Sequence, residues 1–266
     1  METVLSIAGS DPSAGAGIQQ DLKTITAMGC YGATVITAIT AQNTMGVQGV
    51  LPVPALDVQR QIYSVLDDLD VKAVKIGMIP NLEVAVAVVT SLSEHPAAHG
   101  VPVVFDPVMV STSGRELMSP QCLDYIRDRL MRMCTLITPN IPETETLVAC
   151  KLTTPDVIDM AGKRLCSSFS TAFLIKGGHG TGDHVTDRLY IPDGTVTGFI
   201  SPRIESTNMH GTGCTLSSAI ASALAQGYDL IEAVRMGKDM VTGAILNGQH
   251  LGIGHGNGPI WPQSIS

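Results

Sequence analysis

The chain has 266 residues, of which 44% are hydrophobic and 15% are charged, and its formal net charge is −8. This composition is typical of a well-packed globular protein and excludes a disordered or fibrous chain. The negative charge argues against nonspecific binding to nucleic acid or to an anionic membrane, so we expect neither as a partner, but backbone amides could still hold a small anion.

The N-terminus and the cysteines favour a cytoplasmic protein. The opening stretch METVLSIAGSDPS lacks the basic and apolar regions of a signal peptide, and no apolar run reaches the roughly 18 residues that cross a membrane. The six cysteines show no C-x-x-C spacing and form no zinc pattern with histidine, which favours reduced thiols over disulfides or a structural metal.

Short runs of β-branched residues alternate with segments of helical periodicity from the N-terminus onward. The runs predict strands over residues 3–9, 33–40, 71–78, 101–107, 135–139 and 171–177. The segments between them predict helices over residues 16–29, 57–69, 82–93, 119–133, 142–150 and 155–168. Farther along, residues 187–200 predict a hairpin with its turn at Asp193–Gly194, and residues 212–248 predict two helices joined around 227–229.

This order of elements predicts an α/β fold. Strands that alternate with helices form a largely parallel sheet with helices on both faces, and the hairpin adds a small antiparallel edge. No linker rich in proline, glycine or serine divides the chain, so we predict one domain over residues 1–266.

Candidate binding residues gather at the predicted strand ends. Ligands of open α/β sheets bind beyond the carboxyl ends of the parallel strands. The residues at those ends are Ser10, Asp11, Gln42, Asn43, Met78, Asp106, Asn140, Lys176 and His179. We therefore predict one ligand site at this edge of the sheet.

The motif HGTGCTLSS, residues 210–218, places glycines at the start of a helix. Gly211 and Gly213 allow the backbone to turn sharply and to approach a ligand, and the first helical amides, from Thr212 to Cys214, lack partners within the helix. These amides and the positive end of the helix dipole suit a phosphate oxygen. A plain glycine turn at a helix entry is the alternative interpretation.

Cys214 admits several interpretations. As a small apolar residue it could fill the first helical turn, but at a helix N-terminus its thiolate should be favoured, which would suit a base that accepts a proton from a hydroxyl. A cysteine hydrolase with His210 as the base is a further alternative, although proximity in the sequence does not place the two side chains in contact.

The stretches TPNIPETE and LIKGGHG supply further candidates for a phosphate site. Asn140 and Glu143 are three residues apart at the start of a helix, where they could organise Mg²⁺ or could cap the helix. Lys176 leaves a strand toward the same edge and could contact nucleotide phosphates or lie in solvent. No G-x-x-x-x-G-K-[ST] motif occurs, which excludes a P-loop enzyme.

With these residues assembled, the chain resembles the hydroxymethylpyrimidine/phosphomethylpyrimidine kinases of thiamine biosynthesis, in the ribokinase superfamily. The similarity covers most of the chain and rests on motifs that occur in order: IAGSDPSAGAGIQQDLKT, GATVITAITAQNT, KIGM, VFDPVM, LITPNIPE, LIKGGH, HGTGCTLSSAIA and GHGNGP.

The resemblance implies a ribokinase-like three-layer α/β/α sandwich and two phosphoryl transfers from ATP with Mg²⁺. The acceptors would be 4-amino-5-hydroxymethyl-2-methylpyrimidine and then its monophosphate. With the strand-end positions, it assigns catalysis to Cys214, Lys176, Gly211 and Gly213, nucleotide binding to Lys176, Asn140 and Thr212, metal binding to Glu143 and Asp106, and pyrimidine binding to Gln42, Met78, Val108, Asp11 and Gly9.

Within this scheme, Cys214 would replace the aspartate base of the sugar kinases, and the amides of residues 211–214 would form an anion hole. The amide of Gln42 suits a pyrimidine edge because it offers both a donor and an acceptor to a ring nitrogen and its exocyclic amine. Three residues depart from the family pattern: Ala14 stands where glycine is usual, Gln20 where a small residue is common, and Met209 where threonine is often seen.

Two other functions stay open at this point. A pyridoxal or pyridoxine kinase of the same superfamily is the main alternative, and a protein that keeps the fold but only binds its ligand is another. The resemblance also implies a homodimer, since relatives are commonly dimers.

Overall fold

The computed structural model describes residues 1–109, 118–178 and 182–263. In this part of the chain, nine strands form one sheet in the order β3-β2-β1-β4-β5-β6-β7-β8-β9. The strands are β1 (Thr3–Ser10), β2 (Tyr31–Asn43), β3 (Gly46–Pro52), β4 (Val71–Ile76), β5 (Val103–Phe105), β6 (Leu136–Ile137), β7 (Ala172–Ile175), β8 (His184–Tyr190) and β9 (Val196–Pro202).

The sheet is parallel in its centre and antiparallel at both edges. The six neighbouring strands β2, β1, β4, β5, β6 and β7 all run parallel to one another. Strand β3 is antiparallel to β2 at one edge, and β8 is antiparallel to β7 and to β9 at the other. The predicted hairpin is confirmed as β8 and β9, whose turn contains Gly194 at a φ of 92°. Strand β3 was not predicted from the sequence.

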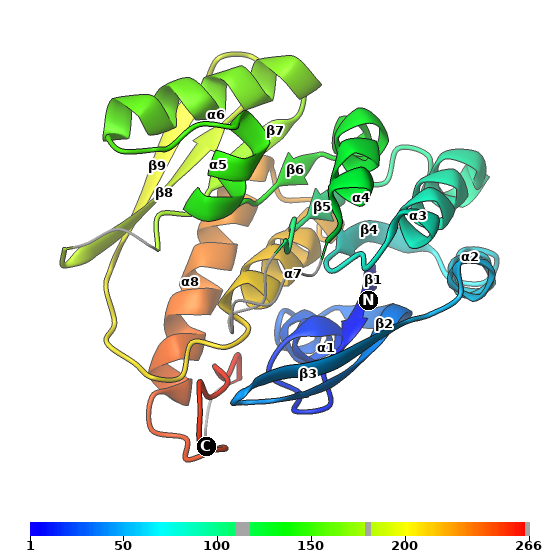
Figure 1. Cartoon of the computed structure of the whole chain (residues 1–266), viewed down its shortest axis with the longest axis horizontal. Coiled ribbons are helices and arrows are strands. Elements are labelled where there is room, and N and C mark those ends of the chain that lie inside the picture. The colour runs from blue at the N-terminus through cyan, green and yellow to red at the C-terminus, as the bar shows by residue number, and fades with distance from the viewer. Residues whose placement is uncertain (110–117, 179–181, 264–266) are drawn as a thin grey trace.

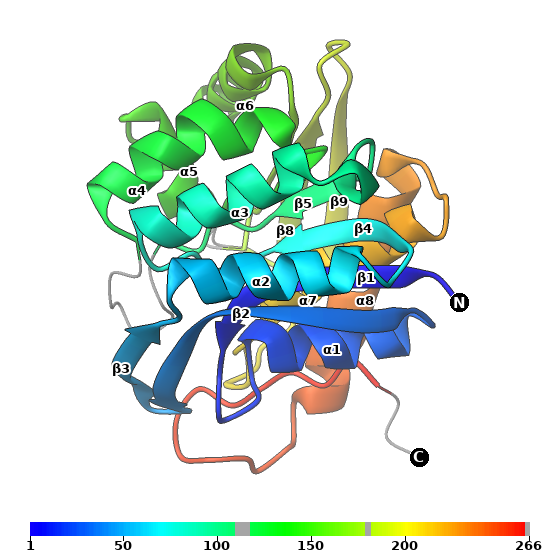
Figure 2. The same ribbon diagram turned by 90° about the vertical axis from the view of Figure 1, so that its right-hand side faces the viewer.

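Helices cover both faces of the sheet (Figures 1 and 2). The α-helices are α1 (Gly17–Ala27), α2 (Ala55–Leu66), α3 (Leu82–Glu94), α4 (Pro120–Tyr125), α5 (Ile141–Val148), α6 (Pro155–Phe169), α7 (Thr212–Ala225) and α8 (Leu230–Gly248). Short helical turns occur at η1 (Pro96–Ala98), η2 (Ile126–Leu130) and η3 (Met131–Met133). None of the described helices is both long and apolar enough to cross a membrane.

Alternate residues of the strands enter two separate cores. On β1, Leu5 and Ile7 belong to the cluster that contains buried residues of α2, α3, α4 and α6. Val4 points to the opposite face and joins the cluster formed with α1, α7 and α8. Because side chains alternate across a strand, a buried strand supplies both cores at once, which explains the continuous apolar runs in the sequence.

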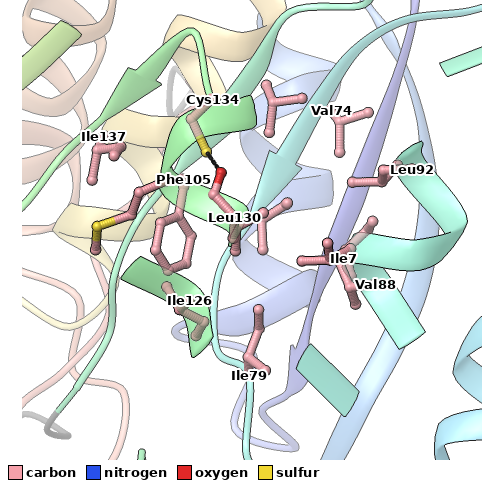
Figure 3. Close-up of a cluster of buried hydrophobic side chains, with 14 of the residues drawn as sticks. Ile7, Val74, Ile79, Val88, Leu92, Phe105, Ile126, Leu130, Cys134 and Ile137 are labelled. Atoms are coloured by element: carbon pink, nitrogen blue, oxygen red, sulfur yellow. Dashed lines mark hydrogen bonds between the residues drawn. The ribbon is translucent and has the colours of Figure 1, made fainter. Parts of the chain in front are cut away.

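Segment 119–133 was predicted as one helix and is instead broken. It forms α4, the π-helical turn η2 and the 3-10 turn η3 in succession. The apolar spacing was correctly recognised, because Ile126 and Leu130 are buried in the first core, where they lie near Phe105 (Figure 3). The sequence pattern identified the buried face but not the change in helical winding.

Cys134 directly follows this segment and is buried in the first core (Figure 3). Its thiol donates to the Leu130 carbonyl at 3.2 Å, and burial raises the pKa of Cys134 far above its usual range. The six cysteines, all within the described residues, are unpaired, as predicted. Cys134 is therefore an inert core residue, which makes it a useful contrast with Cys214.

Candidate active site

The carboxyl ends of the parallel strands open into a cavity of about 720 Å³. The cavity also receives the N-terminus of α7, part of the β8–β9 hairpin and residues of α8. The residues to which the family resemblance assigned a role all lie on its wall: Gly9, Asp11, Gln42, Met78, Asp106, Val108, Asn140, Glu143, Lys176, Gly211, Thr212, Gly213 and Cys214. The structure thus brings these residues together, while their individual roles stay predictions. Of the other predicted strand-end residues, Ser10 lines the cavity and Asn43 does not. His179, the last residue of the LIKGGH motif, lies outside the described residues.

Gly211 and Gly213 are required by the tight packing at the start of α7. Gly211 is the N-cap at a φ of 91°, and a Cβ there would lie 2.0 Å from the Gly15 carbonyl oxygen. A Cβ on Gly213 would lie 3.0 Å from Asp106 Oδ2 and 3.5 Å from Lys176 Nζ. The first helical amides, which have no partner within the helix, therefore begin beside a lysine–carboxylate pair.

Cys214 lies half-buried on the cavity wall rather than deep in a hydrophobic core. The prediction that the helix N-terminus favours its thiolate is wrong for the protein alone. Burial raises the pKa of Cys214 to about 11, and this outweighs the opposing effects of the Lys75 ammonium and of a hydrogen bond from the Gly17 amide. The nearby carboxylates of Asp21 and Asp106 raise the pKa of Cys214 further.

Lys176, Asp106 and Glu143 form a buried charged cluster across from α7. Lys176 Nζ lies 2.8 Å from Asp106 Oδ1 and 4.0 Å from Glu143 Oε2. Burial alone would lower the pKa of Lys176, but the two carboxylates outweigh it and raise that pKa above its usual range. Burial raises the pKa of Glu143 to about 7, with Asp106 adding to the shift and Lys176 opposing it.

Asn140 and Glu143 also cap α5. The Asn140 side chain accepts from the Glu143 amide at 2.8 Å, and Glu143 Oε2 accepts from the Asn140 amide at 2.7 Å. This reciprocal capping box confirms the structural alternative for the pair. A metal role for Glu143 is compatible with the cap, because the capping bond uses only Oε2 of its two carboxylate oxygens.

The first glycine turn is organised by Asp11. Its carboxylate accepts from the amides of Ser13, Gly15 and Ala16 at 2.9 to 3.2 Å. Ala14, which stands where the family has glycine, adopts a φ of 59°, so the strained backbone explains why glycine is usual there.

Gly9 and Met78 lie in contact on the cavity wall. A Cβ on Gly9 would lie 3.1 Å from Met78 Sδ, so the two residues form one patch of wall. His210 Nε2 lies 2.9 Å from Asp11 and 3.2 Å from the Gln42 amide. Because His210 Nε2 contacts Asp11 and not Cys214, these contacts do not favour a hydrolase in which His210 activates Cys214.

The sequence and the fold agree in their similarity to known proteins. The phosphomethylpyrimidine kinase family model matches residues 11–261. A hydroxymethylpyrimidine/phosphomethylpyrimidine kinase of Rhizobium meliloti is 45% identical over 258 residues, which cover 96% of this chain and 95% of the relative. The chain belongs to the phosphomethylpyrimidine kinase family. Members of this family are phosphotransferases, and the chain is one of them.

Two further relatives broaden this comparison. The thiamine biosynthesis bifunctional protein ThiED of Geobacter sulfurreducens is 44% identical over 96% of this chain, which spans 51% of that longer protein. The pyridoxal kinase of Staphylococcus aureus in complex with AMP-PCP and pyridoxal superimposes with a TM-score of 0.87 at 30% identity, covering 98% of this chain and 93% of the kinase. The ribokinase-like α/β/α fold predicted from the sequence is thereby confirmed.

Lys75 is a site residue that the sequence analysis missed. It lies on the cavity wall, fully buried, with Nζ 2.8 Å from both carboxylate oxygens of Asp21. Ser6 and Ser218 donate to the same carboxylate at 2.7 and 2.9 Å. Burial alone would lower the pKa of Lys75, but Asp21 outweighs it, so Lys75 is a cation that favours the thiolate of Cys214.

The end of the cavity nearest α8 was also missed. Lys238 pairs there with Asp187, which in turn accepts from the Gly177 amide at 2.7 Å. Ile204, Val241 and Ile245 line the same region of wall. The signal for Lys75 was a lysine inside an apolar strand run. The residues of α8 lie between the motifs HGTGCTLSSAIA and GHGNGP and belong to neither, so no motif pointed to them.

Proposed function

We propose that the chain transfers the γ-phosphoryl group of ATP to 4-amino-5-hydroxymethyl-2-methylpyrimidine and then phosphorylates the monophosphate to the diphosphate, in thiamine biosynthesis. The observation that carries this proposal is the segment of residues 210–214, which leads into α7. At its start, His210 contacts Gln42, and at its end Gly213 borders Asp106 and Lys176 while Cys214 faces the cavity. One short segment therefore joins a group that suits a pyrimidine with groups that suit a phosphate.

The proposed reaction needs positioning and charge neutralisation more than covalent chemistry. The amides of Thr212, Gly213 and Cys214 would donate to the oxygens of the migrating phosphoryl group, and Lys176 would neutralise its charge. The hydroxymethyl oxygen attacks phosphorus, ADP leaves, and the hydroxyl proton passes to Cys214 Sγ, from which it is later released to solvent. The Lys75 cation would favour the thiolate form that accepts this proton.

We propose Asp106 and Glu143 as the holders of Mg²⁺. The described residues contain no group of three or more His, Cys, Asp or Glu side chains arranged for a metal. Two carboxylates fit Mg²⁺ nevertheless, because this ion commonly binds one or two carboxylates and completes its shell with water and substrate phosphate. When bound, Mg²⁺ would neutralise phosphate charge beside Lys176.

The far end of the cavity supports the assignment of ATP as the phosphoryl donor. Ile204, Val241 and Ile245 offer an apolar wall for a purine ring, and Lys238 lies beside them. The structural relative from S. aureus binds AMP-PCP, an ATP analogue, within the same fold.

A pyridoxal kinase is the second candidate function, because the S. aureus relative carries pyridoxal and superimposes closely. The higher identity to hydroxymethylpyrimidine/phosphomethylpyrimidine kinases favours the pyrimidine. Pyridoxal has no exocyclic amine beside its ring nitrogen, so it would use only part of the hydrogen-bonding capacity of Gln42.

One experiment tests the proposed function. The purified chain is incubated with ATP, Mg²⁺ and the hydroxymethylpyrimidine, and the products are identified by mass spectrometry. We expect the monophosphate first and the diphosphate later, with pyridoxal phosphorylated more slowly under the same conditions. Faster turnover of pyridoxal would assign the chain to the second candidate, and tight pyrimidine binding without ADP release would indicate a binding protein.

We also propose a cytoplasmic homodimer. Six unpaired thiols are typical of a reducing compartment. Ile39 on β2 and Leu51 on the edge strand β3 are cross-strand partners, and both are more than half exposed. An exposed apolar pair at a sheet edge suits contact with a second copy, and light scattering after gel filtration would measure the mass.

A further inference from the structure

Asp11, His210 and Gln42 form a chain of polar contacts on the cavity wall. His210 Nε2 lies 2.9 Å from Asp11 Oδ2 and 3.2 Å from the Gln42 amide nitrogen. Both Asp11 and His210 are buried. The steps of the proposed phosphoryl transfer give this histidine no chemical role.

The position of one proton follows from Asp11. Burial alone would raise the pKa of this carboxyl, but hydrogen bonds from His210 and Ser13 outweigh burial and hold the pKa below its usual range. Asp11 is therefore a carboxylate, which only accepts hydrogen bonds. Because His210 Nε2 faces this acceptor, Nε2 must carry a proton.

A proton on Nε2 fixes the orientation of the Gln42 amide. A protonated Nε2 cannot accept from an amide N–H, and it can only donate to an amide oxygen. Thr40 favours the same orientation from the other side, because its hydroxyl donates to the Ser10 carbonyl at 2.8 Å and its oxygen, 3.2 Å from the Gln42 amide, can then accept from an amide N–H.

Exchanging the amide oxygen and nitrogen of Gln42 satisfies both neighbours without moving any other atom. The oxygen then lies 3.2 Å from His210 Nε2 and takes the weaker share of its single proton, whose main acceptor is Asp11 at 2.9 Å, and the nitrogen donates to Thr40. One N–H and one oxygen lone pair of Gln42 are left for a ligand, in a fixed order along the wall.

The backbone of His210 is held in place independently. Its amide donates to the Gly258 carbonyl at 3.0 Å, and its carbonyl accepts from the Ile260 amide at 3.2 Å. A Cβ on Gly15 would lie 2.3 Å from the imidazole ring, so the ring is tightly enclosed. The imidazole of His210 therefore stays in a fixed position beside the Gln42 amide.

We propose that His210 is the specificity-determining positioning residue of the pyrimidine site: it locks the Gln42 amide so that the site selects a 4-amino over a 4-oxo pyrimidine alcohol. This inference rests on the proposed function. The 4-amino edge presents a ring acceptor beside a donor, whereas the 4-oxo edge presents a ring N–H beside an acceptor. A locked amide matches one order and opposes the other, while a free amide can rotate to match either.

The test compares the 4-amino substrate with its 4-oxo analogue. In the parent enzyme we expect a strong preference for the amine, expressed as a ratio of kcat/KM values. In His210→Phe the ratio should fall about tenfold or more, mainly through faster use of the 4-oxo analogue, with the KM for ATP unchanged. In His210→Gln, which keeps an N–H donor, most of the preference should return. An unchanged ratio in His210→Phe would overturn the inference.

His255→Phe is the matched control. His255 is exposed on the C-terminal segment whose Gly258 and Ile260 bond the backbone of His210. Its backbone amide donates to Thr44, so replacing its side chain leaves that bond intact and we expect the parent ratio in this variant. A fall in His255→Phe as large as that in His210→Phe would show that the segment, not the imidazole, sets the preference, and would contradict the inference.

Nitrogen-15 NMR of the labelled parent protein tests the same inference without any variant. We expect a proton on His210 Nε2 at neutral pH, with and without the pyrimidine. An unprotonated Nε2 would overturn the inference even if the variants fail to fold. Failure of the parent to phosphorylate either pyrimidine would contradict the proposed function, and the NMR result would still decide whether His210 can lock Gln42.

Discussion

Burial and charge compete at a single sulfur atom in Cys214. The helix N-terminus and Lys75 favour the thiolate, but burial raises the pKa of Cys214 to about 11. We therefore expect the rate of alkylation of Cys214 by iodoacetamide to rise about tenfold per pH unit from pH 7 to pH 10, because the thiolate fraction grows in that way below the pKa. Peptide mass spectrometry measures the rate at each pH. A plateau below pH 9 would mean that the thiolate is already favoured without substrate.

The base role of Cys214 has a separate test. A general base contributes about 10²- to 10⁴-fold, so Cys214→Ala should lose kcat by that order while it still binds the pyrimidine in calorimetry. Cys150→Ala is the control, because Cys150 is exposed and lies outside the cavity wall. Turnover of Cys214→Ala within a few-fold of the parent would remove this residue from proton transfer.

Single residues also show how far the sequence could define the site. Asp106, Asn140 and Lys176 could be found because each follows a recognisable strand, and the ends of parallel strands meet at one edge. Lys75 could not be assigned, since nothing in its own strand shows that Asp21, distant in the sequence, would neutralise it. The orientation of Gln42 depends on neighbours brought together only by folding.

At the scale of one element, two glycines at the N-terminus of α7 should affect different properties when they are replaced, one the stability and the other the activity. Gly211→Ala would force a left-handed backbone on alanine and place Cβ against the Gly15 carbonyl, so we expect a loss of about 2–4 kcal/mol in unfolding free energy. Gly213→Ala should lower kcat more than stability, because its Cβ would press on Asp106 and Lys176. Urea denaturation and steady-state kinetics measure the two effects.

Gly252→Ala provides the reference for both glycine variants. A Cβ at Gly252 would meet nothing within 4 Å, so we expect a change in stability within about 0.5 kcal/mol and normal kinetics. If Gly211→Ala were as stable as Gly252→Ala, the explanation of the glycine by close backbone approach would be wrong.

Helix α5 tests whether Glu143 acts beyond capping. In Glu143→Gln an amide oxygen can still accept from the Asn140 amide, so the cap persists while the charge is lost. We expect the Mg²⁺ concentration needed for half-maximal activity to rise about tenfold or more. Glu145→Gln, on the same helix and paired with Lys151, should leave the Mg²⁺ requirement unchanged. Equal behaviour of the two variants would limit Glu143 to the cap.

The same variant predicts a pH dependence of stability in metal-free buffer. The pKa of Glu143 is raised from 4.5 to about 7, so the folded state favours the protonated carboxyl. Its contribution to stability is present below pH 4.5 and is lost as pH rises through 7. Glu143→Gln has no carboxyl group to ionise at this position. Between pH 5 and pH 8 its unfolding free energy should therefore rise by about 1–3 kcal/mol relative to that of the parent, since one pKa unit is worth about 1.4 kcal/mol. Urea denaturation at the two pH values measures the gain.

Elements differ in how well the sequence predicted them. The central strands and α7 with α8 were predicted because buried segments carry strong periodic patterns. Strand β3 was missed because it lies at the sheet edge, where none of its residues is fully buried and no alternation develops. The break after α4 was missed because a π-helical turn preserves the apolar face while it changes the winding.

At the scale of the whole molecule, one sheet separates two cores. The strands contribute to both, so neither helical layer can be lost without exposing the other side of the same strands. This arrangement supports the prediction of one domain from residue 1 to residue 266. It also implies that unfolding should be cooperative across the chain.

Trp261, the single tryptophan of the sequence, can report on that cooperativity from the C-terminal segment. Its amide donates to the Ala244 carbonyl of α8, and the Lys23 ammonium of α1 lies 5.3 Å from its ring centroid. We expect urea midpoints from tryptophan fluorescence and from far-UV circular dichroism to agree within about 0.2 M. A fluorescence transition at lower urea concentration would show that the C-terminal segment, whose Gly258 and Ile260 bond the backbone of His210, detaches before the rest of the chain unfolds. The C-terminal segment would then lie outside the single cooperative unit that we propose.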